Sequence, residues 1–292
     1  MTTELIITGV GCPIPSATSA GPGVLVRYRP PAGDESIHLQ FDAGRSTVMR
    51  LMGADCRPSD LDAVFLTHHH SDHCTGLQDL VLTRWVMDRR GDSPALPIIC
   101  PEGSAVSFAE RMLDAWDNDL AVRKEHTGRT DDPALAITGF PLPPYPGEPV
   151  EVYRRGDVVV RAGQVRHEPV YPAVGYRIDT PDGTMAITGD TLVCDEVATL
   201  AAGVDVLVYE ALRFSEFDEL PPWRTFILDY HADTALIGKQ ALELDTPHLV
   251  LTHLIPPPAD EADEARFVDD IRASGFEGEL TVARDLTTIV LG

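Results

Sequence analysis

Four histidines and one aspartate occupy six consecutive positions within the stretch FLTHHHSDHCTGL, residues 65–77. The cluster follows an apolar run with strand character and precedes a run with helical spacing, so we expect it in a strand-to-helix loop. The backbone of such a loop can turn several side chains toward one point, and imidazole and carboxylate groups are ligands that suit zinc. The pattern HxHxDH therefore predicts metal ligands at His68, His70, Asp72 and His73.

Three polar residues elsewhere in the chain end apolar runs in the same way. His167 ends one in QVRHEP, Asp190 ends another in AITGDT, and His253 ends a third in LVLTHL. Alone, each residue would be more typical of a turn or a helix cap. Because each one terminates a predicted strand, we expect all three at the same edge of a layered sheet structure as the HxHxDH loop. The sequence predicts that they complete the metal site.

Composition narrows the class of protein. No run in the sequence approaches the ~18 consecutive apolar residues that a membrane span needs. The start, MTTELIITGV, lacks the basic segment and the long apolar segment of a secretory signal. Five scattered cysteines without a CxxC pair argue against a cysteine zinc site and against a disulfide framework. We therefore predict a cytoplasmic protein with reduced thiols and no membrane partner.

The charge balance is strongly acidic. The 292 residues include 23 Lys and Arg against 46 Asp and Glu, which gives a formal net charge of −23 at pH 7. Because a grip on phosphate backbones depends on Lys and Arg side chains, this balance argues against nucleic acid as a partner. The same acidity is also typical of an ordinary soluble surface, and a local basic groove stays compatible with it.

Strand patterns and helix patterns follow one another in two rounds, with no linker at mid-chain. Helical spacing is clearest in TGLQDLVLTRWVMDRR (75–90), SAVSFAERMLDAW (104–116), HADTALIGKQALELD (231–245) and ADEARFVDDIRAS (262–274). This order predicts a single α/β (α+β) domain over residues 1–292. Segments 119–149 and 213–230 are expected as surface excursions that shape the pocket. The second carries aromatic residues that either line the pocket or pack the loop against the body: Phe214, Phe217, Trp223 and Phe226.

Taken together, these motifs resemble the metallo-β-lactamase-fold hydrolases, and more narrowly the branch of ribonuclease Z and the arylsulfatase-like enzymes. The resemblance covers nearly the whole chain, from TGVGCPIPSATSAGPGVLV and FDAGRSTVMRLM through LTHHHSDH, TGDT, YEA and YHADTALIGKQA to LVLTH. It implies a four-layer αββα sandwich. The metal motifs are highly specific for this fold and much less specific for the substrate.

The resemblance also implies a dinuclear zinc site, in which Mn²⁺ or Fe²⁺ could replace zinc. The implied ligands are His68, His70 and His167 for one ion, Asp72, His73 and His253 for the other, and Asp190 as the bridge. Two ions about 3.5–4 Å apart would clamp and deprotonate a water molecule, and the bridging hydroxide would attack the substrate while Asp72 orients it. Asp42 in FDAG resembles the aspartate that braces the metal loop by hydrogen bonds.

A carboxylate–histidine pair is implied beside the metals. Glu210 in VLVYEAL lies where ribonuclease Z-like proteins carry the glutamate of their His-Glu-Ala-Thr motif, and His231 in DYHADTALIG matches the histidine that this glutamate holds. A histidine oriented in this way can donate a proton to a departing alkoxide or phenolate. The implied activity is hydrolysis of a small anionic ester, a phosphodiester or a sulfate ester, with Asp72, His231 and Glu210 as catalytic residues.

Departures from ribonuclease Z argue against transfer-RNA processing. Only twenty-two residues separate His167 and Asp190, too few for a long arm that grips transfer RNA, Ser71 replaces a glycine, and Tyr209 replaces the first histidine of the His-Glu-Ala-Thr motif. The expected partner is a small-molecule ester, and His69 is expected to face away from the metals. A lactone or carboxyl ester hydrolase, a redox di-iron protein and a non-catalytic binding module stay open as alternatives. A homodimer is expected by analogy only.

Overall fold

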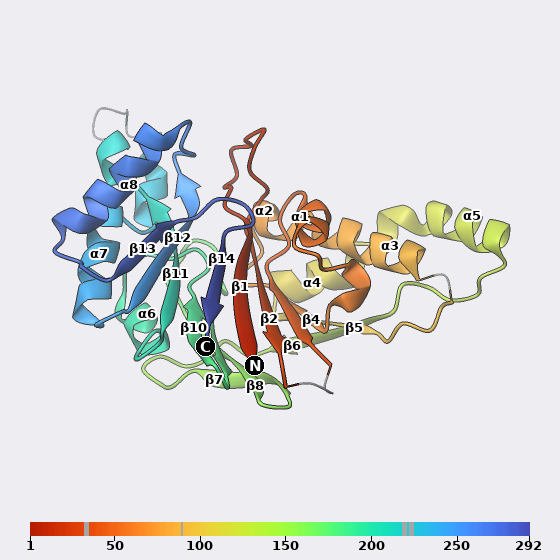
Figure 1. Cartoon of the computed structure of the whole chain (residues 1–292). Coiled ribbons are helices and arrows are strands. Elements are labelled where there is room, and N and C mark those ends of the chain that lie inside the picture. Colours follow the sequence, from red (N-terminus) through yellow and green to blue (C-terminus); the bar gives the residue numbers. More distant parts are fainter. Residues whose placement is uncertain (32–34, 89, 218–220, 222–224) are drawn as a thin grey trace.

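Two seven-stranded β-sheets lie face to face in the computed structural model, which describes residues 1–31, 35–88, 90–217, 221 and 225–292 (Figure 1). In spatial order, the first sheet consists of β14 (Thr288–Leu291), β1 (Thr2–Gly9), β2 (Gly23–Arg29), β3 (Ile37–Phe41), β4 (Ala63–Phe65), β5 (Leu96–Pro101) and β6 (Leu135–Phe140). The second consists of β13 (Glu279–Val282), β12 (His248–Ile255), β11 (Val206–Leu212), β10 (Gly183–Ile187), β9 (Val174–Thr180), β8 (Val158–Gln164) and β7 (Val150–Arg155).

Helices cover the outer faces of both sheets. The apolar sides of α1 (Thr47–Gly53), α3 (Leu77–Met87) and α4 (Ser104–Arg111) form one buried cluster with the first sheet. Those of α6 (Asp195–Leu200), α7 (Thr234–Glu243) and α8 (Glu261–Ala273) form another with the second sheet. Figure 1 shows these two helical layers on opposite sides of the sheet pair. The four-layer αββα prediction is therefore confirmed.

Aromatic packing between the sheets supports the loop that follows β4. The rings of Phe41 and Phe65 are stacked with centroids 4.7 Å apart, and Tyr176 of the opposite sheet packs against them at 5.5 and 5.4 Å. The buried Tyr176 hydroxyl donates a hydrogen bond of 2.7 Å to the carbonyl of Leu66. Because Leu66 lies two residues before His68, the core fixes the origin of the HxHxDH loop. Such aromatic pairs add about 0.5–1.5 kcal/mol beyond simple burial.

The segment 119–149, expected as a surface excursion, contains regular secondary structure. It contains most of α5 (Asp117–Thr127), which projects beyond the first sheet in Figure 1, and it supplies β6, the edge strand next to β5. The helix expected over 104–116 ends at Arg111, and a short 3-10 turn, η2 (Asp114–Trp116), separates it from α5. The sequence did not predict this helix and this edge strand within the expected excursion.

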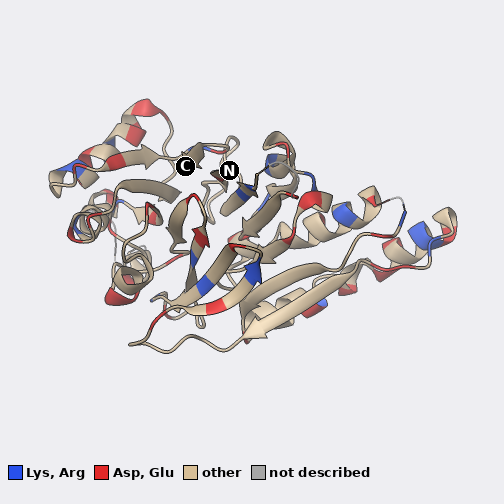
Figure 2. Cartoon of the chain, turned by 60° about the horizontal axis from the view of Figure 1, so that its bottom comes forward, with Lys and Arg blue, Asp and Glu red and all other residues tan. Residues whose placement is uncertain are grey.

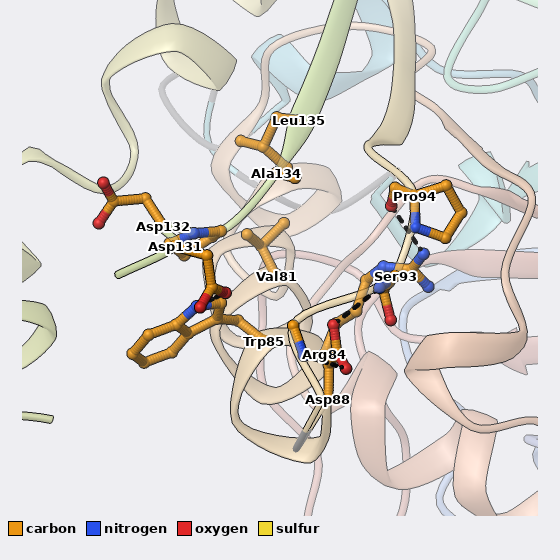
Figure 3. Close-up of a pocket in the computed structure, with 12 residues that line it drawn as sticks. Val81, Arg84, Trp85, Asp88, Ser93, Pro94, Asp131, Asp132, Ala134 and Leu135 are labelled. Carbon is orange, nitrogen blue, oxygen red and sulfur yellow. Dashed lines mark hydrogen bonds between the residues drawn. The ribbon is translucent and has the colours of Figure 1, made fainter. Parts of the chain in front are cut away.

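A half-buried cation, Arg129, anchors the return from α5 to the body. The guanidinium of Arg129 lies 4.5 Å from the ring centroid of Trp85, pairs with Asp131, and donates to the carbonyls of Trp85 and Asp88. Figure 3 shows Asp131 and Trp85 at the side of a small cavity of about 60 Å³, with Arg84 and Asp88 beside them. This cavity shares no residue with the predicted metal site.

The remaining short elements complete the description. They are η1 (Pro58–Asp60), α2 (Ser71–Cys74), η3 (Phe214–Phe217) and η5 (Phe226–Asp229). Among the described residues, none of the helices is long and apolar enough to cross a membrane. The five cysteines are all free thiols, and four of them are buried.

Candidate metal centre

The carboxyl ends of parallel strands bring the predicted ligands to one edge of the sandwich. β3 and β4 run parallel with Phe41 opposite Phe65, and β10, β11 and β12 also run parallel to one another. Loops that follow such strands meet at a common edge, which is the usual place for a site in α/β sheets. The HxHxDH loop follows β4, and the candidate ligands of the second sheet follow β8 and β10 or lie near the end of β12.

All seven predicted ligands meet at this edge. Their nitrogen and oxygen atoms form overlapping groups in which the atoms lie within 4.8 Å of one another: His68, His70, His167 and Asp190; Asp72, His73 and His253; and Asp190, His231 and His253. Six of the seven are buried, and His70 is half-buried. The third group shows that His231, predicted as a proton donor, also lies within reach of the same centre.

Asp190 lies at the centre of the cluster. Its carboxylate oxygens are 3.2 Å from His73 Nε2, 3.5 Å from His253 Nε2 and 3.7 Å from His167 Nε2. Burial would raise the pKa of Asp190, but the neighbouring histidines, His253 first, hold this pKa well below its ordinary value. A charged carboxylate enclosed by imidazoles is the arrangement expected of a bridging ligand.

Unpaired buried atoms indicate that a cation fits here. Among the described residues, His68 Nε2, His73 Nε2 and Asp190 Oδ1 are buried and make no well-aligned hydrogen bond, although the last two atoms lie 3.2 Å apart. Buried polar atoms without partners are costly, and native proteins rarely retain them unless an ion or water satisfies them. Burial lowers the pKa of His68 well below its ordinary value, and burial together with His167 lowers that of His70 to about 4. Neutral imidazoles of this kind have a free lone pair for a divalent metal ion.

Asp42 braces the metal loop as the sequence predicted. Its Oδ2 accepts a hydrogen bond of 2.8 Å from His73 Nδ1, and its two oxygens accept 2.8 Å bonds from the backbone N–H and the hydroxyl of Thr67. Asp42 has a φ of 53°, in the left-handed region that aspartate and asparagine tolerate better than other residues. The carboxylate thus joins the end of β3, the end of β4 and a metal ligand.

Asp42→Ala is expected to weaken metal binding by about 10- to 100-fold, because His73 loses the partner that orients its ring. Competition with a chromophoric chelator would measure the change in Kd. Asp205→Ala is the matched control, since Asp205 also holds a backbone N–H, that of Thr184 at 2.7 Å, but lies outside the ligand groups. Equal metal affinity in the two variants would show that Asp42 does not support metal binding through His73.

Chelation of bound divalent ions is expected to lower the Tm of the protein by roughly 5–10 °C. A ligand present at about 100 times its Kd stabilises the folded state by about 2.7 kcal/mol, and each kcal/mol shifts the Tm of a large domain by about 2–4 °C. Differential scanning fluorimetry with and without EDTA measures this shift. Asp190→Ala should show a low Tm that EDTA no longer changes, whereas an unchanged wild-type Tm would contradict the site.

Glu210 and His231 form a buried pair at the border of the cluster. Glu210 Oε1 lies 2.9 Å from His231 Nδ1 and accepts 3.1 Å bonds from the backbone N–H groups of Thr191 and Ala232. Burial would lower the pKa of His231, but the charge of Glu210 outweighs it and raises this pKa to about 9. Nδ1 is engaged by the carboxylate, so Nε2 is the atom that can exchange a proton with a substrate.

The structure places the residues at which the sequence differs from ribonuclease Z. Tyr209 points away from the centre, because its buried hydroxyl donates to Gln240 Oε1 at 3.0 Å on the side of α7. Residues 168–189 form mainly the antiparallel pair β9 and β10, which turns tightly between Thr180 and Gly183. His69 is exposed and rests against Phe108, as expected for a residue outside the ligand set.

Sequence reasoning missed Tyr230. Its backbone carbonyl lies 2.9 Å from His167 Nδ1, and its ring lies 5.2 Å from that of His167. The only available signal was its place directly before His231. Of the aromatic residues in 213–230, Phe214 and Phe217 pack against the small cluster of Cys12, Leu212 and Ile255, Phe226 is exposed, and Trp223 lies outside the described residues.

Comparison with known proteins agrees with this geometry. The family model of the beta-lactamase superfamily domain matches residues 39–254. A protein named ribonuclease Z from Mycobacterium bovis is 33% identical over 288 residues, 97% of this chain and 96% of that protein. One of the same name from Mycolicibacterium gilvum is 34% identical over 289 residues, 97% of this chain and 94% of that protein.

Two solved structures share the fold. The metallo-β-lactamase fold protein YhfI from Bacillus subtilis aligns with a TM-score of 0.74 at 20% identity, over 99% of this chain and all of that chain. The short form of human tRNase Z aligns with a TM-score of 0.68 at 20% identity, over 99% of each chain. The family match, the sequence relatives and the fold all point the same way: the chain belongs to the metallo-β-lactamase superfamily, in the branch of the ribonuclease Z relatives.

Proposed function

We propose that the protein is a metal-dependent phosphodiesterase that acts on a small anionic diester. The observation that carries the proposal is the buried Glu210–His231 pair at the border of the ligand cluster. Cleavage of an ester with a poor leaving group requires a proton for the departing oxygen, and a carboxylate-held histidine supplies one. The five cysteines are not paired in disulfides, which is typical of a cytoplasmic protein and supports that proposed location.

Zinc is the metal we propose, at two neighbouring positions. His68, His70 and His167 would hold one ion, Asp72, His73 and His253 the other, and Asp190 would join them. When bound, the two ions supply an activated water molecule and stabilise the negative charge that develops on the attacked group. The ligand set contains imidazoles and carboxylates only, which zinc, manganese and iron all accept.

The chain's own residues would prepare the reaction around that centre. Asp72 lies 3.4 Å from His253 Nε2 and would orient the nucleophile. His231 would hold a proton on Nε2 and pass it to the departing oxygen, while Glu210 keeps the ring in place and favours its charged form. Asp42 would hold His73 in its ligating orientation.

The relatives named ribonuclease Z favour a phosphodiester substrate over a sulfate ester, a lactone or a carboxyl ester. A ribonuclease cleaves a phosphodiester bond, and proteins of that name cover nearly the whole chain at 33–34% identity. Sulfate esters and lactones are therefore the weaker candidates.

A true ribonuclease is the second candidate, supported by those same relatives. The charge of −23 and the short β9–β10 segment weigh against a long RNA substrate. In the view of Figure 2, basic residues lie interspersed with acidic ones along the ribbon. We therefore place a small diester first and precursor RNA second.

Turnover by the zinc-loaded protein tests these alternatives. The substrates are bis(4-nitrophenyl) phosphate, 4-nitrophenyl sulfate, a panel of lactones and a transfer RNA with an extended 3′ end. Hydrolysis of the diester without cleavage of the RNA is the expected result. Hydrolysis of lactones alone, or of the sulfate alone, would overturn the proposal. Specific RNA cleavage that weakens steeply with salt would select the second candidate.

A further inference from the structure

Two buried polar atoms beside the metal centre are not accounted for by the metals. Glu210 Oε2 and His253 Nδ1 are both buried, and neither makes a well-aligned hydrogen bond to the described part of the chain. His253 presents its other nitrogen, Nε2, to Asp72 and Asp190 at 3.4 and 3.5 Å, so Nε2 is the atom that would hold a metal ion. A buried N–H donor and a buried carboxylate oxygen each require a partner of their own.

The outer nitrogen of His253 is the exception among the four buried histidine ligands. The other three have a partner for Nδ1 at 2.8, 2.9 and 3.0 Å: Asp42 for His73, the Tyr230 carbonyl for His167, and the Thr67 hydroxyl for His68. A metal-binding histidine normally donates its second N–H to a carboxylate, a carbonyl or a water molecule, which fixes the orientation of the ring. The same requirement applies to His253.

A small cavity between the two sheets is lined by both residues. Its volume is about 20 Å³, and its wall also includes Val24 of β2, Val208 of β11 and Thr252 of β12. A cavity of this size, with polar groups on its wall, has room for one water molecule.

The free oxygen of Glu210 is the one on the cavity side. Oε1 is engaged by His231 Nδ1 at 2.9 Å and by the backbone N–H groups of Thr191 and Ala232 at 3.1 Å. Those three residues do not line the cavity, whereas Glu210 does. The carboxylate therefore directs Oε1 to the proton donor and Oε2 to the cavity.

A β-bulge brings His253 beside Glu210. In the pairing of β11 with β12, Glu210 lies opposite Thr252 and Ala211 lies opposite Leu254, so His253 is the extra residue. Its φ of 47° lies in the left-handed region. Bulges next to functional sites re-aim a side chain in this way. The bulge turns Nε2 of His253 to the metal centre and leaves Nδ1 without a partner from the strands.

We propose that the cavity holds a resident water molecule that accepts a hydrogen bond from His253 Nδ1 and donates one to Glu210 Oε2. The Thr252 hydroxyl, whose contact with the Gly9 carbonyl is 3.5 Å long, provides a third partner, and about three is typical of buried water. Glu210 then orients two stacked rings with centroids 5.5 Å apart, His231 directly and His253 through the water. The inference rests on His253 as a proposed metal ligand and not on the ester that is cleaved.

Val208→Ile tests the water site, because it adds a methyl group to the cavity wall and removes the room for the water. Val206→Ile is the matched control, since Val206 is buried in the same core cluster two residues earlier on β11 and does not line the cavity. High-resolution crystal structures of the zinc-loaded proteins give the result. The water is expected in the wild type and in Val206→Ile, and not in Val208→Ile. A wild-type cavity without water would overturn the inference.

Loss of the water should weaken the binding of one zinc ion by about 10-fold or more, because His253 loses the partner that orients its ring. Competition with a chromophoric chelator measures this affinity without any substrate. Val206→Ile should bind both ions as tightly as the wild type. Equal zinc affinities in the two variants, with the water lost only from Val208→Ile, would show that the water does not orient His253.

A second route into the cavity keeps the test valid if Val208→Ile does not fold. Val24→Ile enters from β2 of the opposite sheet, and Val26→Ile is its control on the same strand and in the same core cluster. Thermal unfolding adds a difference of sign, since filling an empty cavity raises Tm, whereas displacing a hydrogen-bonded water lowers it. A higher Tm in Val208→Ile or Val24→Ile than in the wild type would contradict the water.

The outcomes also separate this inference from the proposed function. If the wild type holds the water and the cavity-filling variants lose zinc affinity, but the wild type hydrolyses no diester, the proposed function fails and the water site stands. If the wild type hydrolyses a diester with an unfilled cavity, the proposed function stands and the water site is wrong.

Discussion

His231→Ala is expected to lower kcat for a diester with a nucleoside leaving group by about 10²–10⁴-fold. The alkoxide that leaves such a substrate is strongly basic and needs a proton as the bond breaks. His231 is held 2.9 Å from Glu210, which favours the protonated ring. The same substitution should cost far less with bis(4-nitrophenyl) phosphate, because nitrophenolate leaves without protonation. Rates on thymidylyl-thymidine and on the nitrophenyl diester give the comparison.

Two controls define the role of this histidine. His126→Ala removes an exposed histidine on α5 and should leave both rates unchanged. Glu210→Gln keeps the shape of the carboxylate but removes its charge, so it should lower the nucleoside rate in the same direction and by less. Equal losses on both diesters, together with a loss of zinc, would mean that His231 acts as a metal ligand. Its closeness to Asp190 and His253 makes this control necessary.

Gly76→Ala is expected to destabilise the fold by roughly 3 kcal/mol, the upper part of the range for overpacking, and to lower Tm by roughly 6–12 °C. A Cβ on Gly76 would lie 1.9 Å from the carbonyl oxygen of Gly44. Because the obstacle is backbone, neither segment can yield by a rotamer change. The Gly76 N–H also donates to the carbonyl of Ala43 at 2.8 Å, so the two segments must shift together.

The same substitution should reduce metal content, since the segment that carries Gly44 begins at Asp42 and Gly76 follows the HxHxDH loop. Gly53→Ala is the matched control. Its Cβ would meet only the tip of the Leu286 side chain at 3.0 Å, and it lies at the end of α1. Thermal unfolding with metal analysis of both variants gives the result. A Tm for Gly76→Ala within about 2 °C of the control would show that the loops can separate without loss.

The gathering of the candidate ligands was predictable because the HxHxDH run is a strong local signal and His167, Asp190 and His253 each end an apolar run. Imidazole and carboxylate groups at the ends of apolar runs are visible in the sequence, and parallel strands then bring them together. Helix α7 (Thr234–Glu243) was predictable for a similar reason, because its apolar residues recur at helical spacing after a capping residue, Asp233. The Asp233 side chain accepts a hydrogen bond from the Ala235 N–H. Asp42 was recognisable only through its resemblance to a known motif. Its role depends on Thr67 and His73, which lie 25 and 31 residues away.

Features made by the backbone were not predictable. The Tyr230 carbonyl that contacts His167 has no signature, since every residue carries such a group. The contact between Gly44 and Gly76 depends on which loops meet, and a single glycine does not reveal its neighbour. β6 was missed because it is a largely exposed edge strand, with only Phe140 fully buried, so its apolar alternation is weak.

The candidate ligands come from both halves of the sandwich. The HxHxDH loop leaves the first sheet after β4, whereas His167, Asp190 and His253 belong to the second. Ions held between them would act as cross-links at one rim, while the opposite rim is joined by protein contacts alone, such as the Thr3 hydroxyl with Asp182 at 2.9 Å. Loss of metal would then leave the catalytic rim joined by protein contacts alone, among them the hydrogen bond from the Tyr176 hydroxyl to the Leu66 carbonyl.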